Sequence, residues 1–332
     1  MALPTREVVG LLSDNLRMRG SVLPVPVRRA THWAREMGLP KGGDTVLYTG
    51  MMYQIVPYLE RLGRLQARLG GSPLGPYLGL ARVANRAVRG FGMRAVARPR
   101  PAERSEFEAV PANVARLLVQ AGVVFGYLYE DDLYSGALTY DMGSDAVVAA
   151  QAQRVAAVLR SNHVRHVITI DPHTTTMLRS VFPRFVQPYD FDVRSYLEVL
   201  AERGLPAGHR PGTEAGSSGE VVVHDSCVYA RYEGVVEAPR QLLTQAGLAV
   251  REPERAGRQT WCCGGPAESL YPAKAAAVAS ERVEQLRAAG TECVTMCPIC
   301  LVNLRKAAKG SIAVRDISEY LMGARAETKA PV

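Results

Sequence analysis

The first 226 residues of this 332-residue sequence contain no cysteine, although six cysteines follow. No run of about 18 apolar residues occurs, so a segment long enough for a membrane-spanning helix is absent. The first residues lack the apolar core of a secretory signal peptide. The net charge is +8, yet no zinc-finger, helix-turn-helix or RNA-binding signature accompanies it. We therefore expect a cytoplasmic protein without a nucleic-acid partner.

What is present favours a folded protein with a metal centre. Hydrophobic residues make up 47% of the chain and charged residues 22%, which is typical of globular domains. The length allows one large or two ordinary domains. All six cysteines are concentrated between residues 227 and 300. Thiolates brought together from three separate loops are the arrangement that soft metals and iron–sulfur clusters require.

Each cysteine-bearing loop has a sequence suited to this task. Residues 220–226 begin with a β-branched run, which predicts a strand that delivers Cys227 at its carboxyl end. Residues 293–296 predict a second short strand before Cys297, followed by a helix from 301. The turn at 262–266 contains two glycines and precedes a helix expected at about 269–288. The predicted ligands thus lie where strands pass into helices, which is where α/β sheets place their sites.

The spacing Cys-x34-Cys-Cys-Gly-x32-Cys-x2-Cys resembles the cysteine-rich "CCG" domain. This domain occurs in heterodisulfide reductase subunits B and D and in the iron–sulfur subunits of glycolate and lactate oxidases. The flanking residues 224–227 and 238–240 match it too. The resemblance implies one [4Fe–4S] cluster, which is non-cubane in the best-understood members, and no flavin or nucleotide on this chain. The ligands that it implies are Cys227, Cys262, Cys263, Cys297 and Cys300, with the backbone N–H groups of Gly264 and Gly265 close to the sulfurs.

Other interpretations of the cysteines remain open. Cys293 lies at an apolar position of a predicted strand, so we expect it to be a small buried hydrophobic residue and not a ligand. Disulfides are disfavoured because a chain of this length can form a core without them. Four of the five thiolates could bind a tetrahedral zinc ion. Adjacent Cys262 and Cys263 argue against zinc, because neighbouring residues rarely both reach one tetrahedral ion.

A degenerate internal repeat is suggested by the N-terminal part of the sequence. Met51, Leu128, Tyr129, Asp171 and Thr174 stand where the cysteines of a first copy would be. We therefore predict an α/β protein of two pseudo-repeated domains, the first of which has lost its cysteines. The predicted parts are a helical lead-in (1–44), the degenerate domain (45–204), a linker (205–219), the cluster-binding domain (220–323) and a tail (324–332).

Three polar residues are candidate catalytic residues. Asp171 and His173, together with Asp131 and Asp132, would line a substrate or quinone pocket beside the remaining cluster, because the two copies should face each other. The alternative is that these four residues form an ordinary solvated or hydrogen-bonded polar cleft. His224 precedes Cys227 by three residues, so it could donate a hydrogen bond to a cluster sulfur and tune its potential.

An insertion at about 62–103 carries Arg82, Arg86, Arg89 and Arg94, which predict a basic amphipathic helix. Such a helix either lies on its own domain, docks a partner or contacts the cytoplasmic face of a membrane.

The resemblance implies an oxidoreductase subunit that passes electrons between flavoprotein or ferredoxin-type subunits and a thiol/disulfide or quinone acceptor. No Cys-x2-Cys-x2-Cys run occurs, so ferredoxin clusters are expected on another subunit. A zinc-stabilised scaffold or assembly subunit of a redox complex is the competing hypothesis.

Overall fold

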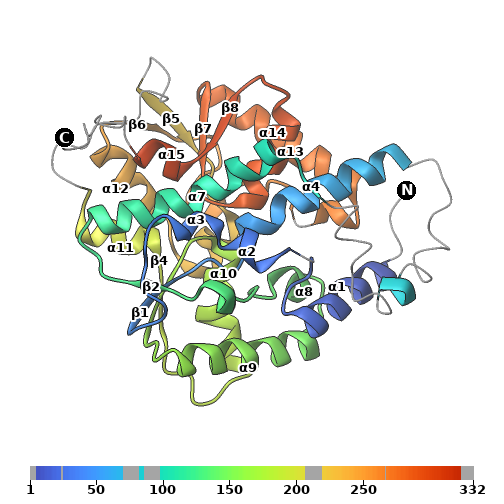
Figure 1. Ribbon diagram of the computed structural model, residues 1–332. Coiled ribbons are helices and arrows are strands. Elements are labelled where there is room, and N and C mark those ends of the chain that lie inside the picture. The colour runs from blue at the N-terminus through green and yellow to red at the C-terminus, as the bar shows by residue number, and fades with distance from the viewer. Residues whose placement is uncertain are drawn as a thin grey trace. The chain divides into compact units, whose positions relative to one another are not determined.

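The computed structural model describes residues 5–23, 25–69, 82–85, 98–205, 219–265 and 267–322. These residues form an α/β protein with two four-stranded sheets (Figure 1), which confirms the α/β part of the predicted fold class. Contacts divide the chain into two compact units, each with one sheet. Of the described residues, the first unit holds those up to 111, 125–194 and 267–275, and the second holds 112–124, 195–265 and 276–322. The domain boundaries given above stay a prediction.

The sheet of the first unit has the strand order β2-β1-β3-β4. Its strands are β1 (Thr45–Tyr48), β2 (Gly126–Tyr127), β3 (His166–Thr169) and β4 (Asp192–Ser195). β1 runs parallel to both neighbours, and Val46 is paired with Gly126 and with Val167. The last three residues of β1 are fully buried, as expected for a central strand of a parallel sheet covered on both faces. A Cβ atom on Gly126 would lie 2.0 Å from the carbonyl oxygen of Gly42, so only glycine permits this approach.

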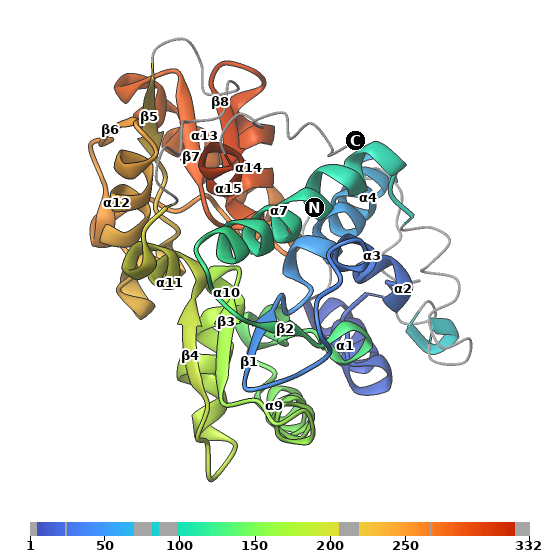
Figure 2. The same cartoon turned by 60° about the vertical axis from the view of Figure 1, so that its left-hand side comes forward.

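The helices of the first unit include a group formed by α1, α8 and α9, which pack together (Figure 2). The helices are α1 (Thr5–Arg19), α2 (Val27–Ala30), α3 (His32–Arg35), α4 (Met52–Leu69), α8 (Ala137–Asp141), α9 (Asp145–Ser161) and α10 (Pro172–Thr176); α7 (Pro101–Gln120) begins in this unit. A π-helical turn (Met177–Val181) follows α10 directly. The backbone departs from helical geometry at Thr31, with φ −103° and ψ 4°, so α2 and α3 are separate helices.

The sheet of the second unit has the strand order β6-β5-β7-β8. As in the first unit, the first strand in the sequence lies between the second and the third. The strands are β5 (Glu220–Val223), β6 (Ala249–Arg251), β7 (Glu292–Thr295) and β8 (Ala313–Asp316), and the helices are α11 (Tyr196–Arg203), α12 (Glu237–Gln245), α13 (Pro272–Ala289), α14 (Pro298–Ala308) and α15 (Ile317–Leu321). β5 is parallel to β6 and β7, and β7 is parallel to β8. α12 packs against both α11 and α15. The strands predicted before Cys227 and Cys297 are thereby found.

Several expected features fall on residues outside the described ranges. These are most of the linker (206–218), the tail (324–332) and the greater part of the basic insertion (70–81 and 86–97). Within the described part of the chain, no helix combines the length and the apolar character needed to cross a bilayer.

Candidate metal centre

Two neighbouring parallel strands deliver three of the cysteines to one edge of the second sheet. β5 and β7 are paired through Val222 and Cys293, so their carboxyl ends lie side by side. Cys227 follows β5 and directly precedes a π-helical turn (Val228–Glu233). Cys297 follows β7 and occupies the N-cap position of α14, which has Pro298 as its first residue. The helix therefore begins at 298 and not at 301 as predicted, and Cys300 lies in its first turn.

The remaining pair comes from a loop before α13. Cys262 and Cys263 lie in the segment 260–265, which forms neither helix nor strand. Gly264 has φ +86°, a conformation that favours glycine, and its N–H lies 3.3 Å from Cys262 Sγ. The expected approach of a backbone N–H group to a cysteine sulfur is present at Gly264. α13 begins at Pro272, three residues later than predicted.

The five predicted ligands form one continuous series of contacting thiols. The thiol of Cys227 interacts with that of Cys262, and Cys262 with Cys263, strongly enough to shift their pKa values. Cys263 interacts in turn with Cys300, and Cys300 with Cys297. Cys263, Cys297 and Cys300 are buried, whereas Cys227 and Cys262 are half-buried. Side chains separated by up to 73 positions in the sequence are thus brought together at one edge of the sheet.

Within this series the sulfur of Cys262 acts as the hydrogen-bond acceptor for its neighbours. Hydrogen bonds from Cys227 and then Cys263, with a further contribution from the Gly264 N–H, lower the pKa of Cys262. The same hydrogen bond from Cys227 to Cys262, together with burial, raises the pKa of Cys227. The cysteines thus provide a sulfur-rich donor set of the kind that soft metal ions bind.

Cys293 is not part of the series. It is fully buried on β7, and its thiol donates to the carbonyl oxygen of Val294 at 3.8 Å. Burial raises its pKa to about 12. This environment suits a small apolar side chain.

Buried hydrogen-bond donors on residues close to the cysteines in the sequence indicate which kind of cofactor the thiols would bind. Four polar atoms there have no hydrogen-bond partner among the described residues: His224 Nε2, Ser226 Oγ, Trp261 Nε1 and Thr295 Oγ1. Each belongs to a residue within three positions of a predicted ligand. A buried donor without an acceptor costs about 1–3 kcal/mol, so such atoms are normally satisfied. A ring nitrogen of His224 lies within 4.8 Å of the Cys263 and Cys300 sulfurs, so acceptor sulfur atoms held there would satisfy this donor, and the residues present therefore fit an iron–sulfur cluster.

His224 lies against this site and is neutral. A ring nitrogen of His224 and the sulfurs of Cys263 and Cys300 all lie within 4.8 Å of one another. His224 is 1% exposed, and Arg282 Nε donates to its Nδ1 at 3.0 Å. Burial, followed by the charge of Arg282, lowers the pKa of His224 to about 3.

Two arginines that the sequence analysis did not assign to the site support its loops. Arg240 makes a bidentate ion pair with Asp225, and Arg282 is fully buried behind His224. A signal for Arg282 does exist in the sequence. It follows Ala279 by three positions and precedes Val283 and Leu286, so it occupies the buried stripe of α13.

The other candidate catalytic residues lie in the first unit. Asp171 is fully buried and caps α10 by accepting the N–H of Thr174 at 2.9 Å. His173 is buried in the same turn, with Nδ1 3.6 Å from Asp141 Oδ2. The expected role of Asp171 and His173 in acceptor binding stays a prediction.

The two neighbouring aspartates, which were grouped as one polar cleft, have separate environments. Asp131 forms an ion pair with Lys41 at 3.0 Å, and both side chains are exposed. Asp132 is buried and accepts from the hydroxyl groups of Thr49 and Tyr127. The structure therefore assigns Asp131 to the surface and Asp132 to a buried hydrogen-bond network.

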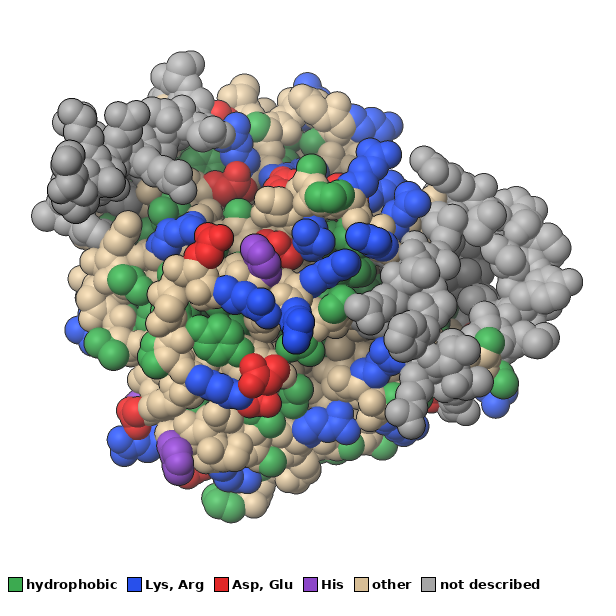
Figure 3. All heavy atoms as spheres, viewed as in Figure 1, with side chains coloured by type: hydrophobic (Ala, Val, Ile, Leu, Met, Phe, Trp, Pro, Cys, Tyr) green, Lys and Arg blue, Asp and Glu red, His purple; other side chains and the backbone are tan. Residues whose placement is uncertain are grey.

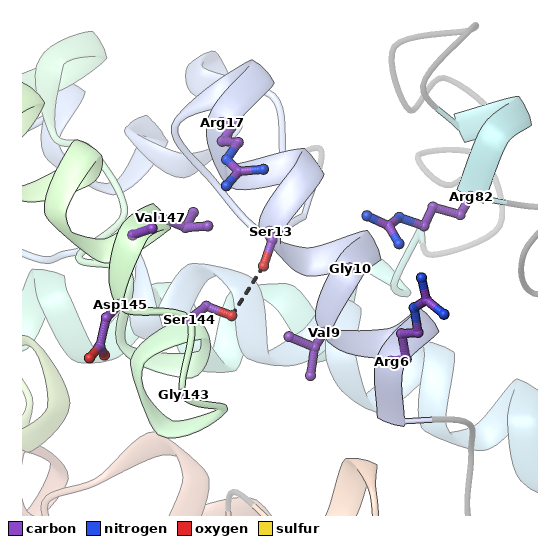
Figure 4. A pocket seen from close by; sticks show the side chains of 11 residues that line it. Arg6, Val9, Gly10, Ser13, Arg17, Arg82, Gly143, Ser144, Asp145 and Val147 are labelled. Atoms are coloured by element: carbon purple, nitrogen blue, oxygen red, sulfur yellow. Dashed lines mark hydrogen bonds between the residues drawn. The ribbon is translucent and has the colours of Figure 1, made fainter.

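Of the four insertion arginines named above, Arg82 alone is among the described residues, and it pairs with carboxylates of its own unit. Arg82 Nε donates to Asp14 Oδ2 at 2.6 Å, and its Nη1 lies 3.8 Å from Glu7. The side chain borders an open cavity of about 710 Å³ that is also lined by α1 and the start of α9 (Figure 4). Figure 3 shows basic side chains interspersed with acidic ones on the face seen in Figure 1. Arg86, Arg89 and Arg94 lie outside the described residues, so docking through them stays a prediction.

Comparison with known protein families bears directly on this site. Residues 221–305 match the family model described as "Cysteine-rich domain", CCG. The match covers the five contacting thiols. The resemblance inferred from the spacing of the cysteines is thereby confirmed for this part of the chain.

Curated relatives match about two thirds of the chain. An EtfAB:quinone oxidoreductase of Syntrophomonas wolfei is 28% identical over 230 residues, which is 65% of this chain and 32% of that protein. A probable iron–sulfur-binding oxidoreductase, FadF, of Bacillus subtilis is 27% identical over 64% of this chain and 30% of its own length. One subunit of the dihydromethanophenazine:CoB–CoM heterodisulfide reductase of Methanosarcina mazei is 28% identical over 64% of this chain and 54% of its own. The chain thus spans between about a third and a half of these relatives.

Proposed function

With a cysteine-rich domain at residues 221–305 as the premise, we propose that this protein is an iron–sulfur subunit of an oxidoreductase complex. One observation carries the proposal: five thiols from three loops form a single contact series. A tetrahedral zinc ion takes four protein ligands and would leave one of these thiols over. A [4Fe–4S] cluster, cubane or non-cubane, would supply a one-electron redox centre at this position.

The chain's own residues have distinct tasks under this proposal. The five cysteines bind the metal as thiolates, and Gly264 directs its N–H at the Cys262 sulfur. Cys263, Cys297 and Cys300 are buried, which keeps water from most of the site. Half-buried Cys227 and Cys262 form its accessible side, which is where electrons would enter or leave.

We also propose that the first unit is a copy of the cluster-binding unit that has lost its cysteines. The identical strand order of the two sheets supports this. Asp171 and Cys297 occupy equivalent positions, because each follows the third strand of its sheet by two residues and occupies the N-cap position of a helix that begins with proline. Thr174 and Cys300 are both three residues further on. The first unit then provides protein scaffold and, through Asp171 and His173, part of the acceptor site.

The proposed partners follow from the relatives. One relative is by name an EtfAB:quinone oxidoreductase and another a heterodisulfide reductase subunit. We propose that this chain likewise passes electrons between a flavoprotein or ferredoxin-type subunit and a quinone or a thiol/disulfide acceptor. Free thiols at a metal centre suit a reducing compartment, so we place this activity in the cytoplasm, with contact to the membrane face if quinone is the acceptor.

Metal analysis of protein purified without oxygen tests the proposal. About four irons per chain, acid-labile sulfide and broad absorbance near 400 nm are expected for a [4Fe–4S] centre. One zinc per chain in colourless protein would instead support the scaffold hypothesis and overturn the iron–sulfur assignment.

A further inference from the structure

Arg282 is a buried charge without a carboxylate partner among the described residues. Its side chain has no exposed surface. The guanidinium donates to four acceptors: His224 Nδ1 at 3.0 Å, the Arg255 carbonyl at 2.9 Å, Gln285 Oε1 at 2.8 Å and Thr260 Oγ1 at 3.4 Å. All four acceptors are neutral. A buried cation normally requires a negative partner, because its lost hydration must be replaced.

The nearby carboxylate does not fill this role. Asp225 interacts electrostatically with Arg282, but both of its oxygens accept hydrogen bonds from Arg240. Burial lowers the pKa of Arg282, and the groups besides Asp225 that favour its charged form are the sulfurs of Cys293, Cys300 and Cys263. Two of these three are predicted cluster ligands. Arg282 is linked to the metal centre by its hydrogen bond to His224, which has a ring nitrogen within 4.8 Å of the Cys263 and Cys300 sulfurs.

His224 stands between Arg282 and the ligands, and its tautomer follows from its bond to Arg282. A guanidinium nitrogen can only donate, so His224 Nδ1 must accept and carries no proton. The single ring proton is therefore on Nε2. That N–H is buried and has no partner among the described residues. The ring lies within 4.8 Å of the sulfurs of Cys263 and Cys300.

We propose that Arg282 is the internal counter-charge of the cluster and a positioning residue that, through His224, keeps an N–H donor directed at its sulfur atoms. This inference rests on the proposed function. Reduction adds negative charge to a cluster, and a nearby cation and a hydrogen-bond donor both stabilise that charge. The Arg282–His224 pair therefore raises the reduction potential of the centre.

The potential of the bound centre tests this inference. In Arg282→Met, the equilibrium constant for reduction is expected to fall at least tenfold, which is about 59 mV for one electron. Arg287→Met is the matched control, since Arg287 lies on the same helix but is exposed and paired with Glu284. Its potential is expected to equal that of the wild type. An unchanged potential in Arg282→Met, with full iron content, would overturn the inference.

The His224→Leu variant and the double variant test whether Arg282 acts through His224. His224→Leu is expected to lower the potential as well, because the donor is lost. If Arg282 acts partly by holding His224, the double variant lowers the potential by less than the sum of the single changes. A full sum would show that the two residues act independently, which contradicts a positioning role.

The unaltered protein provides a test that does not depend on how the variants fold. Nitrogen-15 NMR of the metal-free wild type reports the tautomer of each histidine, and the His224 signal is identified by its absence in His224→Gln. A neutral ring with the proton on Nε2 is expected. A proton on Nδ1 would overturn the inference even if the cluster is present. A wild type that binds no iron would instead sink the proposed function and leave the tautomer result valid.

Discussion

Arg240 holds Asp225 through two parallel hydrogen bonds, from Nη1 to Oδ1 at 2.8 Å and from Nη2 to Oδ2 at 2.9 Å. The Asp225 side chain is 2% exposed, so water does not solvate its charge. Its Oδ2 also accepts the N–H of Gly257, and its carbonyl oxygen accepts the hydroxyl of Thr260. The ion pair therefore connects the loop that carries Cys227 to the segment that leads to Cys262.

Replacing Arg240 with alanine should destabilise the second unit. The change leaves a buried carboxylate without its cation, which typically costs about 3–5 kcal/mol. Chemical denaturation of the metal-free protein measures the loss. Arg251→Ala is the control, because its pair with Glu220 is exposed on both sides and should contribute little. Equal stability of Arg240→Ala and Arg251→Ala would contradict this account of the pair.

Asp132 predicts a pH dependence of stability in the first unit. Burial raises its pKa from 3.8 to about 6. The folded protein therefore holds this proton more tightly than the unfolded chain, and the contribution of Asp132 to stability is greatest below pH 3.8. It decreases as the pH rises toward 6, by about 3 kcal/mol in total. Denaturation curves between about pH 4 and 7 should show this component in the wild type but not in Asp132→Asn; identical slopes would show that Asp132 is not protonated in the fold.

The candidate acceptor residues can be tested without loss of the cluster. Asp171→Ala would also remove a helix cap worth about 1 kcal/mol, so Asp171→Asn, which keeps an acceptor oxygen, is the better variant. Asp171→Asn and His173→Ala should retain the iron–sulfur spectrum, because both residues lie outside the thiol series. Turnover with the true acceptor should fall, while reduction by the donor protein continues. Full turnover in both variants would leave these residues as scaffold.

The basic insertion is tested with Arg86, Arg89 and Arg94 changed together to glutamate. Arg82 is left unchanged, since its loss would take the cation away from the buried Asp14 carboxylate. Each arginine near an anionic bilayer contributes about 1 kcal/mol of attraction. We expect that the triple variant no longer retains a redox partner in a pull-down assay. Neither the wild type nor the triple variant should sediment with anionic vesicles. Vesicle binding that the triple variant loses would favour the membrane-facing alternative.

The strands that carry the cysteines could be predicted because their signals are local. The β-branched run at 220–223 and the apolar or β-branched residues at 293–295 are enough to predict β5 and β7 without reference to the rest of the fold. The start of α14 was predicted three residues too late, at 301, although Pro298 is well suited to the first position of a helix. Local patterns thus predict the elements better than their ends.

Long-range partners could not be predicted in the same way. His224 was identified from its position near Cys227, but its bond to Arg282 joins residues 58 positions apart. Arg282 was missed because an arginine in a helix is ordinarily exposed, and only its place on an apolar stripe points inward. The pairing of Arg82 with Asp14 likewise spans 68 positions. It shows that an arginine expected on a docking surface instead forms an ion pair within its own unit.

The most direct test of the central claim is the iron content and Mössbauer spectrum of wild type, Cys262→Ser, Cys297→Ser and Cys293→Ala after anaerobic reconstitution. If the five contacting thiols hold one four-iron cluster, wild type and Cys293→Ala bind about four irons per chain with the same spectrum. Cys262→Ser and Cys297→Ser should lose iron or give an altered spectrum, because a serine hydroxyl is a harder ligand than a thiolate. Equal iron loss in Cys293→Ala, or unchanged iron and spectra in both serine variants, would contradict the assignment of these thiols as the cluster site.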